Sequence, residues 1–521
     1  MHWDVPIAFN ARERNVAKRL HRMGKFYVFL RQMRHQLFDA SFEAELAKAY
    51  KKPRGTTPLP PALLAMVTLL QAYDQVGDAD AVVTASMDKR WQLVLGTLGE
   101  EEAPFSQGAL VAFRERLIAH ELDRRLVART VELAKASGQF GWQHLRAALD
   151  SSPLIGAGRV EDTWNLLGRA MHQLVVLASQ VTGLSPESIR HASGVTVLGH
   201  TSLKAALDCD WDDPQARQEG LQRLVAEAEA LVSWVHRQSA AAPQEPPLRD
   251  ALADLAQIMT QDLEPDPSGS PRRLRRGTAR DRLPSLGDRE MRHGRKSKAH
   301  PFTGYKRHVL NLLDSKLVVD AVVQPANVPE HVALETLWPS LETQGPVQSL
   351  AIDRAYLSSP LIGSLKAHGI AILAKPWPLR NGDRFTKEAF QLHLDRHEVT
   401  CPAGVTVSLK TSGRQAQFPA ATCGPCPLRA ACTTSGRGRT LSIHPQEALL
   451  IELRAARRTA EGRQGLRQRT AVEHTLARID QIQGKRARYK GTRKNTLDLR
   501  RTAAVNNLQH IQHAQRAGRA A

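Results

Sequence analysis

Residues 145–150 read Leu145-Arg146-Ala147-Ala148-Leu149-Asp150, a short apolar run that ends in an acid and is followed by Ser151-Ser152-Pro153. This pattern predicts a buried β-strand and then a turn. A second apolar run, residues 347–353, ends in the same way at Ile352-Asp353. Carboxylates at such strand ends project into the crevice where open α/β sheets usually bind ligands. If the two strands are neighbours, Asp150 and Asp353 can share divalent cations.

The pattern around these two runs predicts a mixed α/β domain. Periodicity places further strands at 304–310, 316–323 and 370–374, and helices at 331–341 and 360–368. An apolar stripe at helical spacing, from Leu221 to Val235, indicates that a helical insertion follows the first strand.

The chain divides into seven expected segments. Residues 1–140 form a helical N-terminal domain, with a basic amphipathic stretch at 15–38, Pro60-Pro61 opening a helix, and Ser106 capping a long helix at 109–135. The other segments are the first core strand (141–162), the helical insertion (163–264), a basic linker (265–300), the rest of the core (301–379), an irregular cysteine-bearing insertion (380–445), and a long helix with a basic C-terminal tail (446–521).

Composition favours a nucleic-acid partner. The 521 residues carry a formal net charge of +20, and such an excess attracts polyanions because each neutralised phosphate releases counterions. A merely basic, solvated surface is the alternative. No 18-residue apolar run or signal peptide is present, so we expect no membrane partner and a location in the bacterial cytoplasm. An odd count of five cysteines argues against a disulfide framework.

A third acid stands out on the long helix near the C-terminus. Glu473 borders an apolar stripe of Val472, Leu476 and Ile479, and Arg469 lies one turn earlier. Three carboxylates could hold the two metal ions, about 3.5–4 Å apart, that assist phosphodiester cleavage. Hard oxygen ligands suit Mg²⁺ or Mn²⁺. The alternatives are turn or cap roles for the aspartates and a surface Arg–Glu pair.

Five stretches together resemble the bacterial insertion-sequence transposases of the DDE class. They are Leu149-Asp150-Ser151-Ser152; residues 290–296 leading to 302–306; Gln324-Pro325-Ala326-Asn327 with Glu330; Ile352-Asp353-Arg354-Ala355-Tyr356; and Arg469-x3-Glu473 running into Arg488-Tyr489-Lys490-Gly491. The N-terminal region around 58–120 also looks like the helical domain that precedes such cores.

The resemblance implies an RNase H-like core, with a mixed five-stranded sheet and flanking helices, and assigns Asp150, Asp353 and Glu473 to the catalytic triad. It implies two Mg²⁺ or Mn²⁺ ions per active site, cleavage at the terminal inverted repeats of an insertion sequence, and strand transfer into double-stranded target DNA. A homodimer on nucleoid DNA is expected. The chain departs from the family pattern at Leu466 and Asp480, where relatives often have Tyr and Lys; Lys485 or Lys490 could replace the latter.

Two further groups of residues are candidate binding sites. Six of the ten residues from Lys485 to Lys494 are basic, which suits phosphate contacts, and Tyr489 among them could stack on a base. The expected DNA-binding residues are Lys306, Arg307, Arg469, Lys485, Arg486, Arg488, Tyr489 and Lys490. The cysteine array Cys401-x21-Cys423-x2-Cys426-x5-Cys432 contains one knuckle-like pair, so it predicts a structural zinc site or buried reduced thiols, with redox chemistry as the last alternative.

Two alternative functions remain open from the sequence. A tyrosine-type recombinase would use Tyr489 as its nucleophile among Arg486 and Arg488, but this leaves the strand-end acids without a role. A catalytically inactive, DNA-binding relative of the transposases is the non-enzyme alternative, and an intact set of three acids argues against it.

Overall fold

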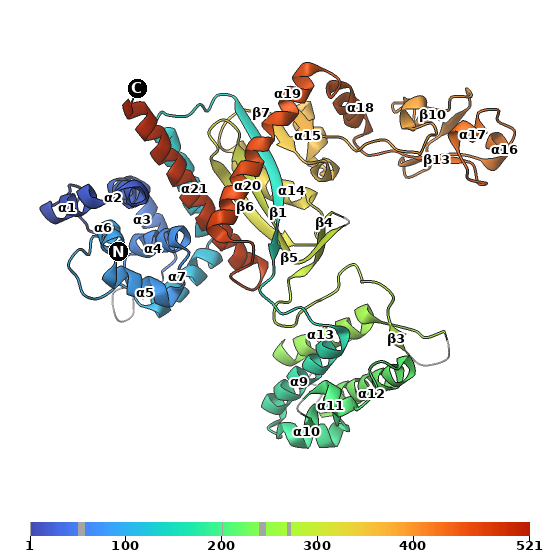
Figure 1. Ribbon diagram of the computed structural model, residues 1–521, viewed down its shortest axis with the longest axis horizontal. Helices are drawn as coiled ribbons and strands as arrows, with labels where there is room; N and C mark the ends of the chain where they lie inside the picture. The colour runs from blue at the N-terminus through green and yellow to red at the C-terminus, as the bar shows by residue number, and fades with distance from the viewer. Residues whose placement is uncertain are drawn as a thin grey trace.

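The computed structural model describes residues 2–50, 58–200, 202–238, 246–267, 272–297 and 299–520 (Figure 1). Residues 268–271 and 298 of the expected linker lie outside the described residues. In the described part of the chain, no helix is both long enough and apolar enough to span a membrane.

A mixed sheet of six strands forms the centre of the molecule (Figure 1). Strand β5 (His300–Leu312) pairs antiparallel with β1 (Leu145–Ile155) on one side, and successive parts of it pair antiparallel with β4 (Arg292–Ser297) and β6 (Val318–Pro325). Strand β7 (Val347–Ile352) runs parallel to β1, and β8 (Ala371–Ala374) parallel to β7. The α/β character agrees with the sequence, but five strands were expected; the additional strand β4 comes from the presumed linker.

The first strand is longer than its apolar run. The turn expected at Ser151-Ser152-Pro153 is wrong, because these residues continue β1 and pair with His308, Arg307 and Lys306 of β5. The pairing of β1 with β7 ends at Leu149. Pro153 therefore lies beyond that pairing, at a place where a strand tolerates proline.

The N-terminal region is helical. Its elements are α1 (Ala11–Arg19), α2 (Lys25–Leu37), α3 (Ala40–Ala47), α4 (Pro61–Asp74), α5 (Asp78–Met87), α6 (Lys89–Leu95), α7 (Gln107–Ala119) and α8 (Leu122–Ala136). The Ser106 hydroxyl accepts a hydrogen bond from the Ala109 N–H at 3.2 Å, as a cap should. The single helix expected at 109–135 is instead two helices, separated at Glu121, whose φ is +52°.

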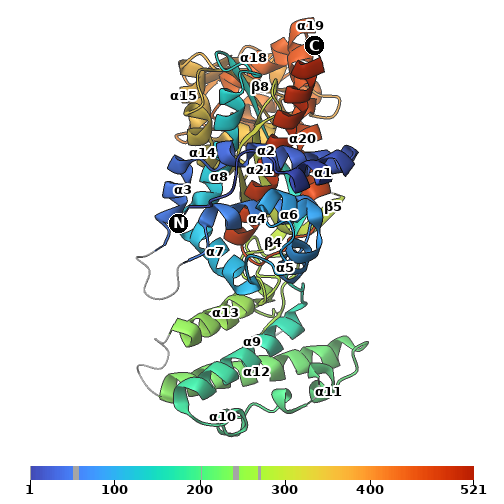
Figure 2. The ribbon, with the colours of Figure 1, turned by 90° about the vertical axis from the view of Figure 1, so that its left-hand side faces the viewer.

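The insertion after β1 forms a separate bundle below the sheet (Figures 1 and 2). It comprises α9 (Thr163–Thr182), α10 (Pro186–Ser193), α11 (Leu203–Leu207), α12 (Pro214–Gln238) and α13 (Pro246–Asp262). Leu224, Leu231 and Val235 of the expected stripe are buried in a core shared with α9 and α13.

The expected irregular insertion contains small sheets. Strands β9 (Gln391–His393), β10 (Glu398–Thr400) and β11 (Thr406–Ser408) form one, and β12 (Gln415–Phe418) and β13 (Arg439–Ser442) form another, beside the short helices α16 (Ala420–Cys423) and α17 (Arg429–Cys432). We call residues 385–443 the cysteine lobe; it extends away from the main sheet (Figure 1).

Helices flank the sheet and continue the chain to its end. Helices α14 (His331–Glu342) and α15 (Leu361–Ala367) lie close to their expected bounds. The long helix expected at the start of segment 446–521 is instead divided into α18 (Glu447–Ala456), α19 (Ala460–Gln468) and α20 (Thr470–Gln483).

The C-terminal end is not a solvated tail. Residues 492–520 form a long helix, α21 (Thr492–Ala520), which lies between the N-terminal helices and the sheet (Figures 1 and 2). Leu497, Val505, Leu508 and Ile511 pack into the N-terminal core, whereas Leu499 packs with buried residues of β5 and β6. The expectation of a basic tail is therefore wrong after residue 491, because α21 buries its apolar face on both sides.

Candidate active site

The acids that follow the two apolar runs lie side by side. Leu149 of β1 is paired with Ile352 of the parallel strand β7, so the next residues, Asp150 and Asp353, lie next to each other where the pairing of these two strands ends. Asp150 Oδ1 accepts the Ser151 N–H at 2.8 Å, and Asp353 Oδ1 accepts the Arg354 N–H at 2.8 Å. These backbone contacts orient the carboxylates of Asp150 and Asp353.

Helix α20 brings the third acid to this edge. Val472 and Ile479 are fully buried and Leu476 nearly so, which fixes the apolar side of the helix against the sheet. Arg469, at the helix N-cap, lies with its guanidinium 3.4 Å from Asp150 Oδ2 and 3.4 Å from Glu473 Oε1. The Glu473 side chain is 55% exposed, so it stands at the rim of the site.

The three acids line one cleft of about 440 Å³. Its lining side chains are Asp150, Ser151, Ser152, Pro153, Arg295, Lys296, Phe302, Lys306, Glu330, Asp353, Arg469, Glu473, Leu476, Ala477 and Asp480. Among the described residues, no three His, Cys, Asp or Glu side chains are already arranged as a metal site. The acids therefore share a cleft without forming a closed ligand set, and Arg469 stands between two of them.

Glu330 is a fourth acid in the cleft, which we did not assign to the site from the sequence. Its Oε1 accepts the Ser151 hydroxyl at 3.2 Å and lies 3.6 Å from the Lys306 ammonium. The available signal was its position just after the Gln324-Pro325-Ala326-Asn327 stretch of the family resemblance.

Burial, together with the negative charges of Asp353 and Glu330, raises the pKa of Asp150 to about 6, against the opposing effects of the Ser151 hydrogen bond and Arg469. A carboxyl group in this state is stabilised in its ionised form when a cation arrives. The electrostatics therefore favour cation binding beside Asp150.

A neutral hydrogen-bonded pair is buried close to the acids. His308 Nδ1 lies 2.7 Å from the Tyr356 hydroxyl, and both side chains are fully buried. Burial lowers the pKa of His308 to about 3 and raises the pKa of Tyr356 well above its usual value. Both groups stay uncharged near neutral pH, so the pair adds no charge beside the acids.

Arg307 is not available to DNA, contrary to the sequence-based expectation. Its guanidinium is fully buried and donates to Gln483 Oε1 at 3.0 Å and the Gly484 carbonyl at 2.9 Å, and it forms an ion pair with Asp480. This pair accounts for the family departure at position 480, because an acid is needed opposite the buried arginine. Lys306, its neighbour on the other face of β5, does line the cleft.

The basic side chains of segment 485–490 are exposed, as the sequence predicted. Lys485, Arg486 and Lys490 are exposed, whereas Arg488 donates to the carbonyls of Val76 and Gln75 at 3.1 and 3.3 Å. The half-buried Tyr489 ring lies between the guanidinium groups of Arg114 and Arg501, at 6.0 and 5.9 Å. Tyr489 does not line the acidic cleft, so the recombinase alternative gains no support from its position.

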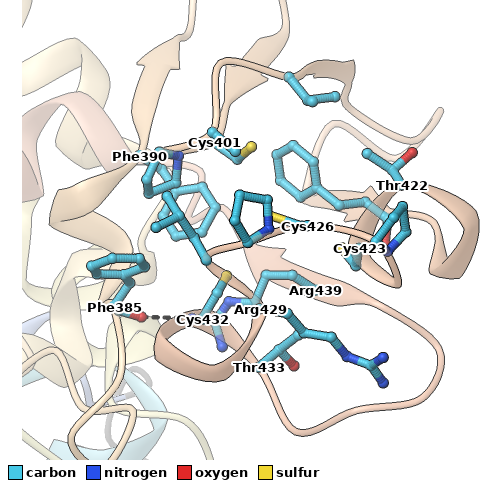
Figure 3. A pocket seen from close by; sticks show the side chains of 17 residues that line it. Phe385, Phe390, Cys401, Thr422, Cys423, Cys426, Arg429, Cys432, Thr433 and Arg439 are labelled. Atoms are coloured by element: carbon cyan, nitrogen blue, oxygen red, sulfur yellow. Dashed lines mark hydrogen bonds between the residues drawn. The ribbon is translucent and has the colours of Figure 1, made fainter.

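The four clustered cysteines face one cavity of about 240 Å³ in the cysteine lobe (Figure 3). Cys401, Cys423, Cys426 and Cys432 are all free thiols. Burial raises the pKa of Cys432, and the other three thiols raise it further, in opposition to Arg439. The sequence array thus corresponds to a spatial cluster, although within the described residues it is not already arranged as a metal site.

Two family models match the chain. Residues 400–512, which contain Glu473 and most of α21, match a model described as Transposase DDE domain. Residues 15–116, in the N-terminal helices, match a model described as Transposase domain (DUF772). No curated protein and no solved structure matches the chain.

Proposed function

With transposase family matches in its N-terminal and C-terminal parts, this chain is a DNA transposase, and we propose that it cuts DNA with Asp150, Asp353 and Glu473. The observation that carries the proposal is the register of β1 and β7, which sets Asp150 beside Asp353 in a cleft that Glu473 also lines. The mixed sheet around these acids is compatible with an RNase H-like core, which we propose as the fold.

The donor set fits Mg²⁺ or Mn²⁺, because the cleft presents carboxylate oxygens and the charge around Asp150 favours a cation. Two such ions would stabilise the attacking and leaving oxygens and lower the pKa of the attacking water. If such ions were held by Asp150 and Glu473, Arg469 would have to move from between them, and its guanidinium would then be free to bind a DNA phosphate.

The proposed reaction has two stages. A water molecule attacks the phosphate at the element end, the bond to the 3′-oxygen breaks, and a 3′-hydroxyl is released. That hydroxyl then attacks a phosphate of double-stranded target DNA, and a new phosphodiester bond replaces the one that breaks. Because strand transfer needs both terminal inverted repeats together, we propose a homodimer on DNA, with the N-terminal helices recognising the repeats.

The triad is tested by cleavage of DNA that carries the inverted repeats bordering the reading frame. Asp150→Asn, Asp353→Asn and Glu473→Gln should each lower Mg²⁺-dependent cleavage by roughly 10³-fold or more, and the triple variant should be little worse, because such residues act as a unit. Glu342→Gln, an exposed acid on α14, is the matched control and should retain cleavage. If Glu473→Gln cuts normally whereas Glu330→Gln does not, Glu330 takes the third place in the site.

For the cysteine lobe we propose a structural zinc site of Cys401, Cys423, Cys426 and Cys432. The shared cavity supports it, since thiolates prefer Zn²⁺ to the hard ions of the acidic cleft. Purified, reduced protein should contain about one zinc per chain and lose it, with a fall in stability, on Cys423→Ser. Active protein that holds no zinc would favour buried thiols.

A further inference from the structure

The β4–β5 hairpin brings unpaired positive charge to the rim of the acidic cleft. Arg295 and Lys296 of β4 are exposed and line the cleft, as does the half-buried Phe302 of β5. The other two cations of the cleft are already engaged: Lys306 lies near Glu330, and Arg469 lies between Asp150 and Glu473. Within the described residues, the side chains of Arg295 and Lys296 have no hydrogen-bond or ion-pair partner.

Close packing fixes the hairpin against the sheet. A Cβ on Gly294 would lie 2.7 Å from Ala326 Cβ, 2.9 Å from the Ala326 carbonyl oxygen and 3.0 Å from Phe302 Cζ. Only glycine permits this approach, so β4 lies directly on the chain after β6, and the Phe302 ring covers Gly294. Arg295 and Lys296 follow immediately and are held at the rim by this contact.

Hydrogen bonds tie the base of the hairpin to the helical insertion as well. His293 Nδ1 lies 2.9 Å from Thr303 Oγ1 across the two strands, and its Nε2 lies 3.3 Å from the Arg282 guanidinium. The same guanidinium donates to Asp262, the last residue of α13, at 2.7 and 2.9 Å. The position of the hairpin is therefore set by both the core and the insertion.

We propose that this hairpin is a DNA-positioning arm of the active site. Arg295 and Lys296 bind backbone phosphates of the strand to be cut, beside the scissile linkage, and Phe302 packs against the neighbouring nucleoside. The cleft thus separates two tasks, because its acids hold metal ions and its unpaired cations, Arg295 and Lys296, hold phosphates. The inference rests on the proposed function and adds residues that the triad and the basic segment 485–490 do not include.

The direct test measures DNA binding without added Mg²⁺ or Mn²⁺, so that it does not depend on catalysis. The probe is a duplex carrying the bordering inverted repeat, with one neutral methylphosphonate placed at a single linkage at a time across its end. For the wild-type protein, the neutral linkage should weaken binding at the phosphates that the arm contacts. For the double variant Arg295→Gln with Lys296→Gln, those same linkages should no longer matter.

A salt series gives the second readout. The double variant should flatten the log–log dependence of affinity on salt by about 1.8, or about 0.9 for each phosphate that the variant no longer neutralises. The matched control neutralises two exposed cations of the cysteine lobe, Lys410→Gln with Arg437→Gln, and should leave the slope unchanged. Thermal melting of both variants should match the wild type, because all four side chains are exposed.

The contact between Phe302 and the neighbouring nucleoside is measured by the fluorescence of a 2-aminopurine placed next to the cut site. Phe302→Leu should raise the fluorescence of bound DNA at one position, since it removes a stacking partner. The double variant could bind with the same sensitivity to methylphosphonate linkages and the same salt slope as the wild type. That result would overturn the proposal that Arg295 and Lys296 bind phosphates, even if the wild-type protein cleaves DNA. The wild-type protein could instead show no metal-dependent cleavage while methylphosphonates still weaken its binding at the expected linkages. That result would reject the proposed chemistry and leave the hairpin as a DNA contact.

Discussion

Arg500→Ala should destabilise the protein by about 3 kcal/mol, because this residue joins α21 to two other elements through buried charges. Arg500 is 3% exposed; its Nε lies 3.0 Å from Asp320 Oδ1 of β6, and its Nη1 lies 3.1 Å from Asp123 Oδ2 of α8. Removing one partner of a buried ion pair costs about 3–5 kcal/mol. The lower end applies because Arg124 still contacts Asp320, and Arg493 still contacts Asp123.

Urea denaturation followed by circular dichroism and tryptophan fluorescence measures this loss. The control Arg249→Ala removes an exposed arginine that pairs with Asp250 at 3.4 Å, and should change stability by about 0.5 kcal/mol or less. Since α21 packs against both the N-terminal helices and the sheet, the signals of both parts should shift together. A loss no larger than that of the control would refute the role of this network, as would a shift of the N-terminal helices alone.

Two other buried charges can be tested in the same way. Arg307→Met should cost about 3 kcal/mol in urea denaturation because Asp480 loses its partner, yet leave the salt dependence of DNA binding unchanged; a flatter slope would restore Arg307 as a phosphate contact. Burial raises the pKa of Glu447, but hydrogen bonds from Lys387 and the His444 N–H outweigh it, so the pKa lies below its ordinary value of 4.5. Ionised Glu447 therefore adds stability above pH 4.5 that is lost as pH falls through the folded pKa. Glu447→Gln should lower Tm at pH 7 and flatten the fall of Tm below about pH 4.5, whereas parallel Tm profiles would contradict this.

Asp150 and Asp353 could be identified from the sequence because each follows a short apolar run. Leu149 and Ile352 are fully buried, and the acid that follows each of them lines the cleft. Glu473 was placed by the apolar stripe of its helix, in which Val472 and Ile479 are fully buried. Such local periodicity reports which side of an element faces the core, so it located these three acids without knowledge of their partners.

The end of β1 and the edge strand β4 could not be predicted from local periodicity in the same way. Ser151, Ser152 and Pro153 have the composition of a turn, and only pairing with β5 makes them strand. The residues of β4 are basic and polar, and they form a strand because Gly294 allows close contact with Ala326. Tertiary pairing overrides local propensity at both places.

The C-terminal helix was not predicted because its arginines resemble those of a solvated tail. Arg500 and Arg501 are buried and paired with aspartates, so they do not act as free cations. A usable signal was present: Leu497, Val505, Leu508 and Ile511 recur at helical spacing. Most of the exposed basic residues of this segment consequently lie just before α21, and Lys494 lies in its first turn.

The most direct test of metal-assisted cleavage replaces the bridging 3′-oxygen of the scissile linkage with sulfur. This atom leaves when water attacks the phosphate, and a metal ion held by Asp150, Asp353 and Glu473 should contact it. Sulfur binds the softer Mn²⁺ better than Mg²⁺. Wild-type protein should therefore cut the sulfur-containing DNA poorly in Mg²⁺ and recover in Mn²⁺, while cutting normal DNA in both. Equal cleavage of the sulfur-containing DNA in the two metals, or cleavage that persists in Asp150→Asn, would contradict the account.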